Sequence, residues 1–203
     1  MRLYDKYVLP RLVHFVCSLK PAMQQREKLI PQARGRVVEI AAGSGLNFRY
    51  YNPAAVSHLW ALDSSAEMLR LAEKQPAQVK PELIQANADC LPLDDQCADT
   101  VVITYSLCSI KNDLASLNEI RRILKPGGRL LFCEHGLAPD RNVSRLQHLI
   151  NPVWKRLSGG CHLNKDIPTL LKQSGFHMER LTAGYISGWR PACFNYLGSA
   201  KLR

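Results

Sequence analysis

Paired cysteines of the kind that hold zinc or build a disulfide framework are missing from this sequence. Its seven cysteines are an odd number, they are scattered along 203 residues, and no two of them are spaced as C-x-x-C. This distribution argues against a disulfide-stapled secreted fold and against a zinc ribbon. We therefore expect no metal site, and a reducing, cytoplasmic location fits the cysteines best.

Long apolar runs are also missing. No stretch reaches the roughly 18 unbroken apolar residues of a transmembrane helix, and the N-terminus has no small-residue cleavage site of a signal peptide. We expect a chain that does not span a membrane and whose mature form starts at Met1.

Acidic residues are scarce relative to basic ones. There are 17 Asp and Glu against 27 Lys and Arg, which gives a formal net charge of +10. A positive balance suits nucleic acid, an anionic membrane surface, or an anionic small molecule. The basic residues form no dense run with interleaved aromatics, so we expect a small-molecule substrate and no nucleic-acid partner. Peripheral contact with a membrane and the oligomeric state stay open.

The pattern of apolar residues predicts one α/β domain over residues 1–203. A chain of this length with 46% hydrophobic residues buries one good-sized core. From about residue 36, short apolar runs alternate with amphipathic stretches, which is typical of βαβ units. The sequence thus predicts a Rossmann-like core over residues 36–203, with helices at 113–124 and 145–157. The expected strands are residues 36–40, 58–62, 82–85, 100–104, 129–133, 177–182 and 194–199.

Residues 1–30 are expected to form one or two amphipathic helices, with Pro10 and Pro21 as breaks. We predict that this segment is a helical lid. Tyr4 and Tyr7 each have an apolar ring and a polar hydroxyl group, which suit a cofactor that has both apolar and polar parts. The alternative is that its apolar side lies at a membrane surface. The apolar residues available to one side are Leu3, Tyr7, Leu12, Phe15, Val16 and Leu19.

A turn rich in small residues follows the first expected strand, and it is the first chemical signal in the chain. Small residues let a ligand approach the backbone, and a helix after the turn would offer unpaired N–H groups. A tight strand-to-helix turn without a ligand would need the same glycines, so the turn alone leaves both interpretations open. The turn consists of Ala41, Ala42, Gly43, Ser44, Gly45, Leu46 and Asn47.

Asp63 ends the second expected strand, 20 residues after Gly43. An acidic residue at this place accepts hydrogen bonds from both ribose hydroxyls of a nucleoside cofactor. Ser64 and Glu67 are spaced as a capping box for the next helix. The helix start is thereby assigned to Ser64, and Asp63 is predicted to be free for a ligand.

Two classes of cofactor bind to a small-residue turn followed by a carboxylate at the end of the next strand, and the residue at position 48 distinguishes between them. A dinucleotide site counted from Gly43 needs Gly or Ala there, and the ring of Phe48 would block the close packing that this small residue serves. The pattern Glu39-x-Ala41-x-Gly43-x-Gly45 instead resembles the first motif of class I methyltransferases, which use S-adenosylmethionine (SAM). Ala41 takes the place of the commoner first glycine.

Three later segments extend this resemblance. Residues 87–92 resemble the segment after the third strand, whose acidic side chain, here Asp89, meets the adenine amino group in that superfamily; Asp89 also suits a loop cap. Residues 99–104 and 124–131 match its fourth strand and the turn before its fifth. The resemblance implies a seven-stranded, mostly parallel sheet with helices on both faces, SAM as cofactor and S-adenosylhomocysteine as product. The cofactor site that it implies is Tyr4, Tyr7, Glu39, Ala41, Ala42, Gly43, Ser44, Gly45, Asn47, Asp63, Ser64, Met68, Ala88, Asp89, Cys90, Tyr105 and Ser106.

Residues 107–112, 134–135 and 151–163 lie outside the generic motifs. They look like the methyltransferase-like 7 group of thiol S-methyltransferases and its bacterial relatives, which implies methylation of a small molecule and suggests a thiol acceptor. Related bacterial sequences are grouped with methyltransferases that act on quinone precursors or phospholipids, so an enzyme at the membrane surface stays open. A cofactor-binding protein without activity is the third alternative.

Methyl transfer is an in-line displacement, so the protein has to hold the acceptor about 3 Å from the methyl carbon and exclude water. A thiol with a pKa of about 8.5 supplies some thiolate without help, whereas a hydroxyl or carbon acceptor needs a base. His135, after the fifth expected strand, is the candidate base, and it equally suits a structural role. We place His135, Trp154 and His162 at the substrate pocket. The cysteines expected to be packing residues are Cys90, Cys108, Cys133 and Cys161.

Overall fold

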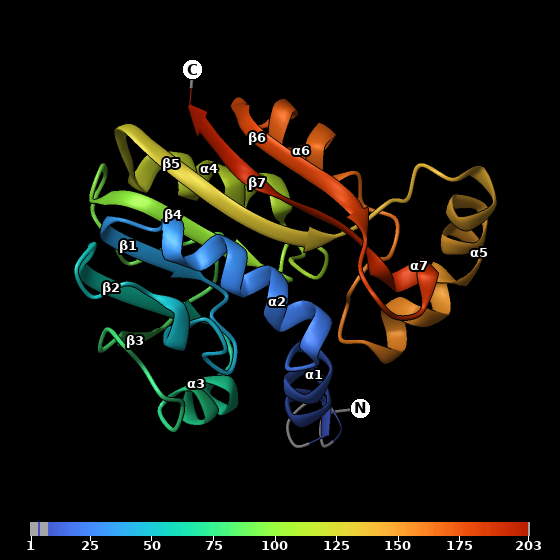
Figure 1. The fold of residues 1–203 in the computed structure, drawn as a ribbon, viewed down its shortest axis with the longest axis horizontal. Helices are drawn as coiled ribbons and strands as arrows, with labels where there is room; N and C mark the ends of the chain where they lie inside the picture. Colours follow the sequence, from blue (N-terminus) through green and yellow to red (C-terminus); the bar gives the residue numbers. More distant parts are fainter. Residues whose placement is uncertain (1–3, 5–7, 203) are drawn as a thin grey trace.

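A single seven-stranded sheet organises the chain (Figure 1). The computed structural model describes residue 4 and residues 8–202. The strand order is β3-β2-β1-β4-β5-β7-β6; the first five strands are parallel, and β7 is antiparallel to both β5 and β6. The predicted fold class is confirmed. The strands are β1 (Gly35–Ile40), β2 (Val56–Asp63), β3 (Glu82–Gln85), β4 (Ala98–Thr104), β5 (Leu124–His135), β6 (Phe176–Tyr185) and β7 (Phe194–Leu202).

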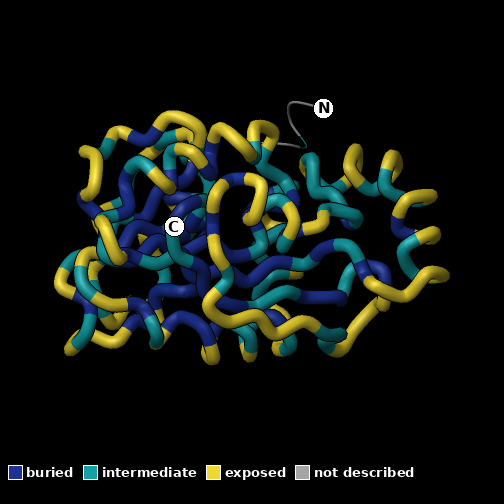
Figure 2. The backbone as a smooth tube through the Cα atoms, turned by 90° about the horizontal axis from the view of Figure 1, so that it is seen from above, coloured by how far each residue is buried: buried dark blue, intermediate teal, exposed yellow. Residues whose placement is uncertain are grey.

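The central strands are apolar on both faces because both faces are covered. One face packs under α4 (Asp113–Ile123) and α6 (Ile167–Gln173). The other packs against the end of α2 (Lys20–Leu29), the following 3-10 turn (Ile30–Gln32) and α3 (Ala66–Ala72). Figure 2 shows the buried residues in the interior of the molecule, with exposed segments around them. This layering places the carboxyl ends of the parallel strands at one edge, where ligands bind in open α/β sheets.

Two local predictions were wrong. No α-helix follows the turn after β1, only a 3-10 turn (Phe48–Tyr50), because Phe48 and Tyr51 are buried and hold this short segment against the sheet. The backbone N–H groups at this edge therefore belong to the turn itself. Residues 125–128, expected to lie between a helix and a strand, belong to β5, where the register with β4 shifts.

The N-terminal segment divides into two helices with different environments. Pro10 and Pro21 lie in the first turns of α1 (Leu9–Cys17) and α2, where a missing N–H costs nothing. Leu29 and Ile30, at the end of α2, are buried in the core. The end of α2 is therefore part of the core, whereas α1 lies over the strand ends, where α2 also contributes Arg26; a lid function of this segment stays a prediction.

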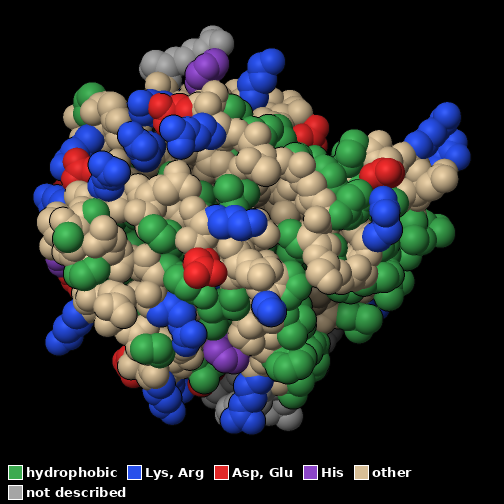
Figure 3. Space-filling view, in the orientation of Figure 1, with side chains coloured by type: hydrophobic (Ala, Val, Ile, Leu, Met, Phe, Trp, Pro, Cys, Tyr) green, Lys and Arg blue, Asp and Glu red, His purple; other side chains and the backbone are tan. Residues whose placement is uncertain are grey.

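An apolar stripe on α5 (Arg141–Leu157) faces outward, at the end of the molecule where α7 (Arg190–Cys193) also lies (Figure 1). In the space-filling view, hydrophobic side chains gather on this side of the surface (Figure 3). Among the helices of residues 8–202, none is long and apolar enough to cross a membrane. The exposed members of the stripe are Leu146, Leu149, Val153 and Leu157.

Candidate active site

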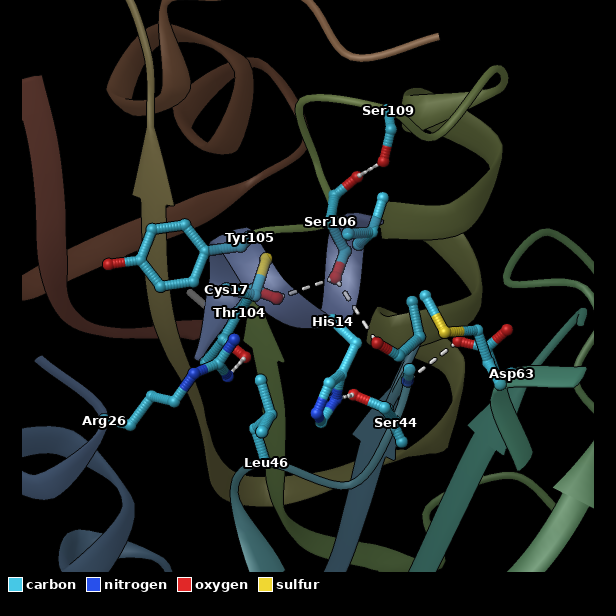
Figure 4. Close-up of a pocket in the computed structure, with 15 residues that line it drawn as sticks. His14, Cys17, Arg26, Ser44, Leu46, Asp63, Thr104, Tyr105, Ser106 and Ser109 are labelled. Carbon is cyan, nitrogen blue, oxygen red and sulfur yellow. Dashed lines mark hydrogen bonds between the residues drawn. The ribbon is translucent and has the colours of Figure 1, made fainter. Parts of the chain in front are cut away.

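A cavity of about 140 Å³ opens at the carboxyl ends of β1, β2 and β4 (Figure 4). Its walls come from α1, α2, the turn after β1, the end of β2 and the segment after β4. On the α1 side, His14 Nδ1 lies 2.7 Å from Ser44 Oγ, so the helix is tied directly to the turn. Eight of the predicted cofactor residues line this cavity: Ala41, Ala42, Gly43, Ser44, Asp63, Met68, Tyr105 and Ser106.

The turn after β1 is held in a conformation that needs small residues. Gly43 has φ +59° and Gly45 has φ +76°, and even Ala41 has φ +50°, a left-handed region that costs a residue with a side chain about 1–2 kcal/mol. A Cβ on Gly43 would meet nothing closer than the Ala41 carbonyl, at 3.9 Å. The absent side chain therefore leaves space at the cavity wall for a ligand.

Asp63 ties the end of β2 to this turn. Its two carboxylate oxygens accept the backbone N–H groups of Gly43 and Ser65, each at 2.8 Å. Burial raises the pKa of Asp63, and these two hydrogen bonds oppose the rise. Each oxygen still has a free lone pair for a ligand hydroxyl. Asp63 is thus both a structural clamp and an acceptor at the cavity wall.

The helix start beside Asp63 differs from the prediction. Ser65, not Ser64, caps α3, because its hydroxyl accepts the Met68 N–H at 3.3 Å. Glu67 forms an ion pair with Arg70 instead of closing a capping box. Ser64 is exposed and does not line the cavity.

A buried polar network lies beneath the turn. Glu39 accepts hydrogen bonds from the Tyr51 hydroxyl at 2.7 Å and from the Asn47 amide at 2.9 Å. Asn47 in turn accepts from the Arg26 guanidinium, which also donates to Thr104. Glu39 and Asn47, predicted to contact the cofactor, therefore face inward and support the turn from below. Burial raises the pKa of Glu39 to about 7, against the hydrogen bonds from Tyr51 and Asn47.

Arg26 was missed by sequence reasoning, although it lines the cavity and is buried. Its guanidinium also lies 5.1 Å from the centre of the Tyr105 ring, in the range of a cation–π contact. A signal existed: Ala22, Arg26, Leu29 and Ile30 recur at helical spacing, and they are the buried residues of that segment. A single arginine on an otherwise apolar helix face indicates a buried polar partner.

The raised pKa of Glu39 predicts a loss of stability between about pH 4.5 and 7. The folded chain holds this proton more tightly than the unfolded chain, whose Glu has the ordinary pKa of 4.5. The stabilisation is complete below pH 4.5 and is lost as pH rises through about 7, by roughly 3 kcal/mol. Denaturant unfolding of Glu39→Gln across this range should show a flatter pH dependence than the parent. A Glu27→Gln control, exposed on the same α2, should keep the parental slope; an equal slope in Glu39→Gln would contradict the prediction.

Several predicted cofactor residues lie elsewhere. Ala88, Asp89 and Cys90 follow β3 but do not line the cavity, and Asp89 accepts a hydrogen bond from Asn112 at 2.9 Å on the surface. Gly45 is buried within the turn and does not line the cavity. The Tyr4 hydroxyl donates to the Leu157 carbonyl on α5. Tyr7 lies outside the described residues. A cofactor contact by any of these residues stays a prediction.

His135 and Trp154, predicted for the substrate pocket, meet at one sulfur, and neither residue lines the cavity. His135 Nε2 lies 3.1 Å from Cys161 Sγ, and the Trp154 indole N–H donates to the same atom at 3.4 Å. Cys108 completes the group, and its thiol is the main influence that lowers the pKa of Cys161, with further help from His135 and Trp154 against burial. The structure thus assembles predicted substrate-pocket residues around cysteines that were predicted only to pack.

His162 is hydrogen-bonded to this group through its backbone. Its backbone N–H donates to the Cys108 carbonyl at 2.8 Å, and its ring faces the Asn151 amide at 3.3 Å. Burial lowers the pKa of His162, and the neighbouring Lys155 and Lys165 lower it further. The position indicates a residue that joins the turn after α5 to the turn after β4.

Glu134 fixes the turn after β4. Both of its carboxylate oxygens accept the Ser106 N–H, at 2.8 and 3.0 Å, and Tyr105 beside it has φ +53°. Burial raises the pKa of Glu134 to about 7, opposed by the N–H groups of residues 106–108. The same carboxylate therefore positions Ser106 at the cavity and Cys108 beside it.

The known proteins that resemble this chain in sequence are methyltransferases. Residues 38–132 match the family model described as a methyltransferase domain. The chain is 30% identical over 174 residues to thiol S-methyltransferase TMT1B from Homo sapiens, covering 80% of this chain and 70% of that protein. The rat protein of the same name is 29% identical over 79% of this chain, which spans 65% of its length. Demethylmenaquinone methyltransferase from Clavibacter sepedonicus is 34% identical, over 80% of this chain and 76% of that one.

Solved structures agree on the fold. The methyltransferase in a complex with the Trm112 activator of Haloferax volcanii superposes with a TM-score of 0.74 at 16% identity, covering 98% of this chain and 95% of that one. An S-adenosylmethionine-dependent methyltransferase from Mesorhizobium loti gives 0.66 at 19% identity, over 89% and 95%. With a sheet of this order, a carboxylate at the end of β2 and relatives at 30% identity or more, the chain belongs to the SAM-dependent methyltransferases.

Proposed function

We propose that this protein transfers the methyl group of SAM to the sulfur of a small thiol, in the cytoplasm. The observation that carries the proposal is the chemistry beside the cavity: two thiols and an imidazole gather there, from Cys108, Cys161 and His135. The nearest buried carboxylate, Glu134, accepts backbone N–H groups. Because Nε2 of His135 is itself in contact with the Cys161 sulfur, an acceptor that supplies its own nucleophile suits this arrangement better than one that needs a free base. The similarity to thiol S-methyltransferases supports the same acceptor.

The cavity residues fit SAM. Asp63 would accept hydrogen bonds from the ribose hydroxyls with its remaining lone pairs, and the turn at Gly43 and Ser44 would let the cofactor lie close to the backbone. Met68 offers a polarisable side chain to the flat adenine ring. When bound, SAM supplies a methyl group on a positively charged sulfur.

The protein's part in the reaction is to position the two partners and exclude water. The segment after β4 contributes Ser106 and Ser109 to the cavity, and Cys108 lies between them in the chain. On the opposite side α1 closes the cavity with Val13, His14 and Cys17. These walls would hold an acceptor sulfur in line with the methyl group of bound SAM and would keep water out, which would strengthen the attraction between a thiolate and the sulfonium.

A panel of acceptors tests the proposal directly. Purified protein would be incubated with SAM and alkyl thiols, catechols, quinol analogues or phosphatidylethanolamine, and the products identified by mass spectrometry. We expect thioethers from the thiols, with one S-adenosylhomocysteine formed for each thioether. Methylation of a quinol or lipid without any thioether would refute the thiol assignment and leave the SAM site intact.

A second candidate function is methylation of a quinone precursor or phospholipid at a membrane surface. The specific observation in its favour is the exposed apolar stripe of α5, which lies among the basic residues Arg145, Lys155 and Arg156. An amphipathic basic helix of this kind suits an anionic lipid surface. The similarity to demethylmenaquinone methyltransferase points the same way. Under this candidate, the protein should float with anionic liposomes, and Leu149→Ser with Val153→Ser should abolish flotation.

Two glycines of the turn predict separable defects. Gly43→Ala should cost about 1–2 kcal/mol of stability, from the left-handed backbone alone, but its methyl group should weaken SAM binding at least 10-fold. Gly45→Ala should cost about 2–4 kcal/mol, because its Cβ would lie 2.6 Å from the Phe48 ring and 3.1 Å from Ala72. Denaturant unfolding and calorimetric titration with SAM measure the two effects. Unchanged SAM affinity in Gly43→Ala would place the cofactor away from this turn.

A further inference from the structure

Three soft donor side chains meet beside the SAM cavity, from segments far apart in the sequence. Cys108 lies in the turn after β4, His135 ends β5, and Cys161 lies in the turn after α5. One ligand atom of each, two sulfurs and an imidazole nitrogen, lies within 4.8 Å of the others. Because no two of them are close in sequence, the spacing of cysteines along the chain gave no sign of this group.

Only one of the two imidazole nitrogens of His135 has a polar contact with the described residues. Its Nε2 faces the Cys161 sulfur, and its Nδ1 is buried without a hydrogen-bond partner among the described residues. Buried polar atoms in proteins are almost always paired, so the unpaired Nδ1 means that no hydrogen bond to the described residues fixes the ring from that side. The Cys161 sulfur already accepts the Trp154 N–H, a contact that stabilises a thiolate. Nε2 of the ring and the sulfur therefore lie close enough to be ligands of one cation.

The donor set is the one that zinc prefers. Tetrahedral Zn²⁺ binds sulfur at about 2.3 Å and imidazole nitrogen at about 2.0–2.1 Å, which implies donor separations of about 3.6 Å for N and S and about 3.8 Å for two sulfurs. The present group, with all separations under 4.8 Å and one at 3.1 Å, reaches that geometry by adjustments of several tenths of an ångström to about 1 Å. Sites with two Cys, one His and an open fourth position are catalytic zinc sites.

We propose that Cys108, His135 and Cys161 bind a thiophilic divalent cation, Zn²⁺, and that its open fourth position takes the sulfur of the acceptor. The first half of this proposal stands on the donor geometry alone, and the second half rests on the proposed thiol methylation. It also departs from the expectation of no metal site, which considered only local cysteine spacing.

The cation gives the site a means of activating the acceptor. The thiol releases its proton to solvent as its sulfur binds, since a coordinated thiol is deprotonated. The sulfur lone pair forms the bond to the methyl carbon while the bond from that carbon to the SAM sulfur breaks, and its electron pair stays on S-adenosylhomocysteine. The product thioether is neutral and a weaker ligand, so it leaves. Ser106 and Ser109 line the cavity, and Cys108 lies between them in the chain, so the donor group is next to the cavity wall.

Cobalt titration of the full chain tests the binding site without relying on activity. Chelator-treated, reduced protein would be titrated with Co²⁺, whose near-ultraviolet charge-transfer band reports bound thiolates and whose visible bands report tetrahedral geometry. We expect one Co²⁺ per chain, with two thiolates, displaced by one equivalent of Zn²⁺. Cys108→Ser and Cys161→Ser should each remove about half of the charge-transfer intensity, while Cys193→Ser, a partly buried cysteine on α7, should change nothing.

Folded parent protein that binds no Co²⁺, or binds it without a thiolate band, would overturn the proposal even if thiols are methylated. Adding an alkyl thiol without SAM should add a third thiolate to the charge-transfer band, and the matching alcohol should not. No such change would overturn the fourth-ligand role. If cobalt binds as expected but no thiol is ever methylated, the proposed function fails and the metal site stands.

Discussion

Asp63→Asn is expected to weaken SAM binding by about 100-fold. The carboxylate would accept two charge-assisted hydrogen bonds from the ribose hydroxyls, each contributing about 1.5 kcal/mol, and about 3 kcal/mol in total corresponds to that factor. The asparagine amide would also face one of the two backbone N–H groups that Asp63 now accepts, from Gly43 and Ser65. The turn would therefore lose its clamp as well as its ligand acceptor.

Isothermal titration of parent and variant with SAM and with S-adenosylhomocysteine measures this loss. Asp95→Asn is the matched control, because Asp95 is exposed, pairs with Arg122 and lies outside the cavity; its affinity should equal that of the parent. Thermal unfolding of Asp63→Asn shows whether the fold persists. If a folded Asp63→Asn protein binds SAM as tightly as the parent, the ribose must lie elsewhere.

The strands and the first part of the site could be predicted because they depend on local sequence. All seven expected strands are present, and residues 82–85 match β3 at both ends. The turn at Gly43 and the carboxylate at Asp63 were found because a parallel sheet brings consecutive strand ends to one edge. Spacing along the chain is enough to place such residues together.

The inward-facing network could not be predicted in the same way. Glu39 was assigned to the ligand by its place in a motif, but alternation along β1 directs its side chain beneath the turn, where Tyr51 and Asn47 bind it. Which side of a strand faces a ligand depends on the layer packed above it. Arg26, which completes the network, comes from a helix whose position over the sheet no local pattern fixes.

The cluster of Cys108, His135 and Cys161 shows most clearly what could not be predicted from the sequence. Each of these residues lies at or after the end of a helix or strand that the sequence predicts. Whether the three side chains come together depends on where the chain after α5 returns to the sheet, through contacts such as that of the His162 N–H with the Cys108 carbonyl. Cysteines scattered in sequence are indistinguishable from packing residues until the fold is known. Spatial grouping, rather than number or spacing, gives them a chemical role.

Removing residues 1–18 is expected to lower kcat/KM at least 100-fold while leaving the protein folded. In α1, only Pro10 is buried, so little core is lost. The helix does supply Val13, His14 and Cys17 to the cavity, and Leu9 lies where a Cβ of Gly159 would be, next to the turn that carries Cys161. Loss of α1 would open the cavity to water and release that turn, and water exclusion is part of how such sites accelerate transfer.

Removing residues 1–30 should instead unfold the protein, which separates α1 as a lid from α2 as core. Leu29 and Ile30 are fully buried, and losing large buried side chains costs about 2–5 kcal/mol each. Steady-state kinetics and thermal unfolding of both truncations measure the contrast. The full-length control is Phe15→Ser, because the Phe15 side chain is exposed and does not line the cavity, so this change should leave kcat/KM unchanged. If the protein lacking residues 1–18 retains its kcat/KM but no longer floats with anionic liposomes, α1 serves the membrane surface and not the cavity, because its outward apolar residues would then be the functional ones.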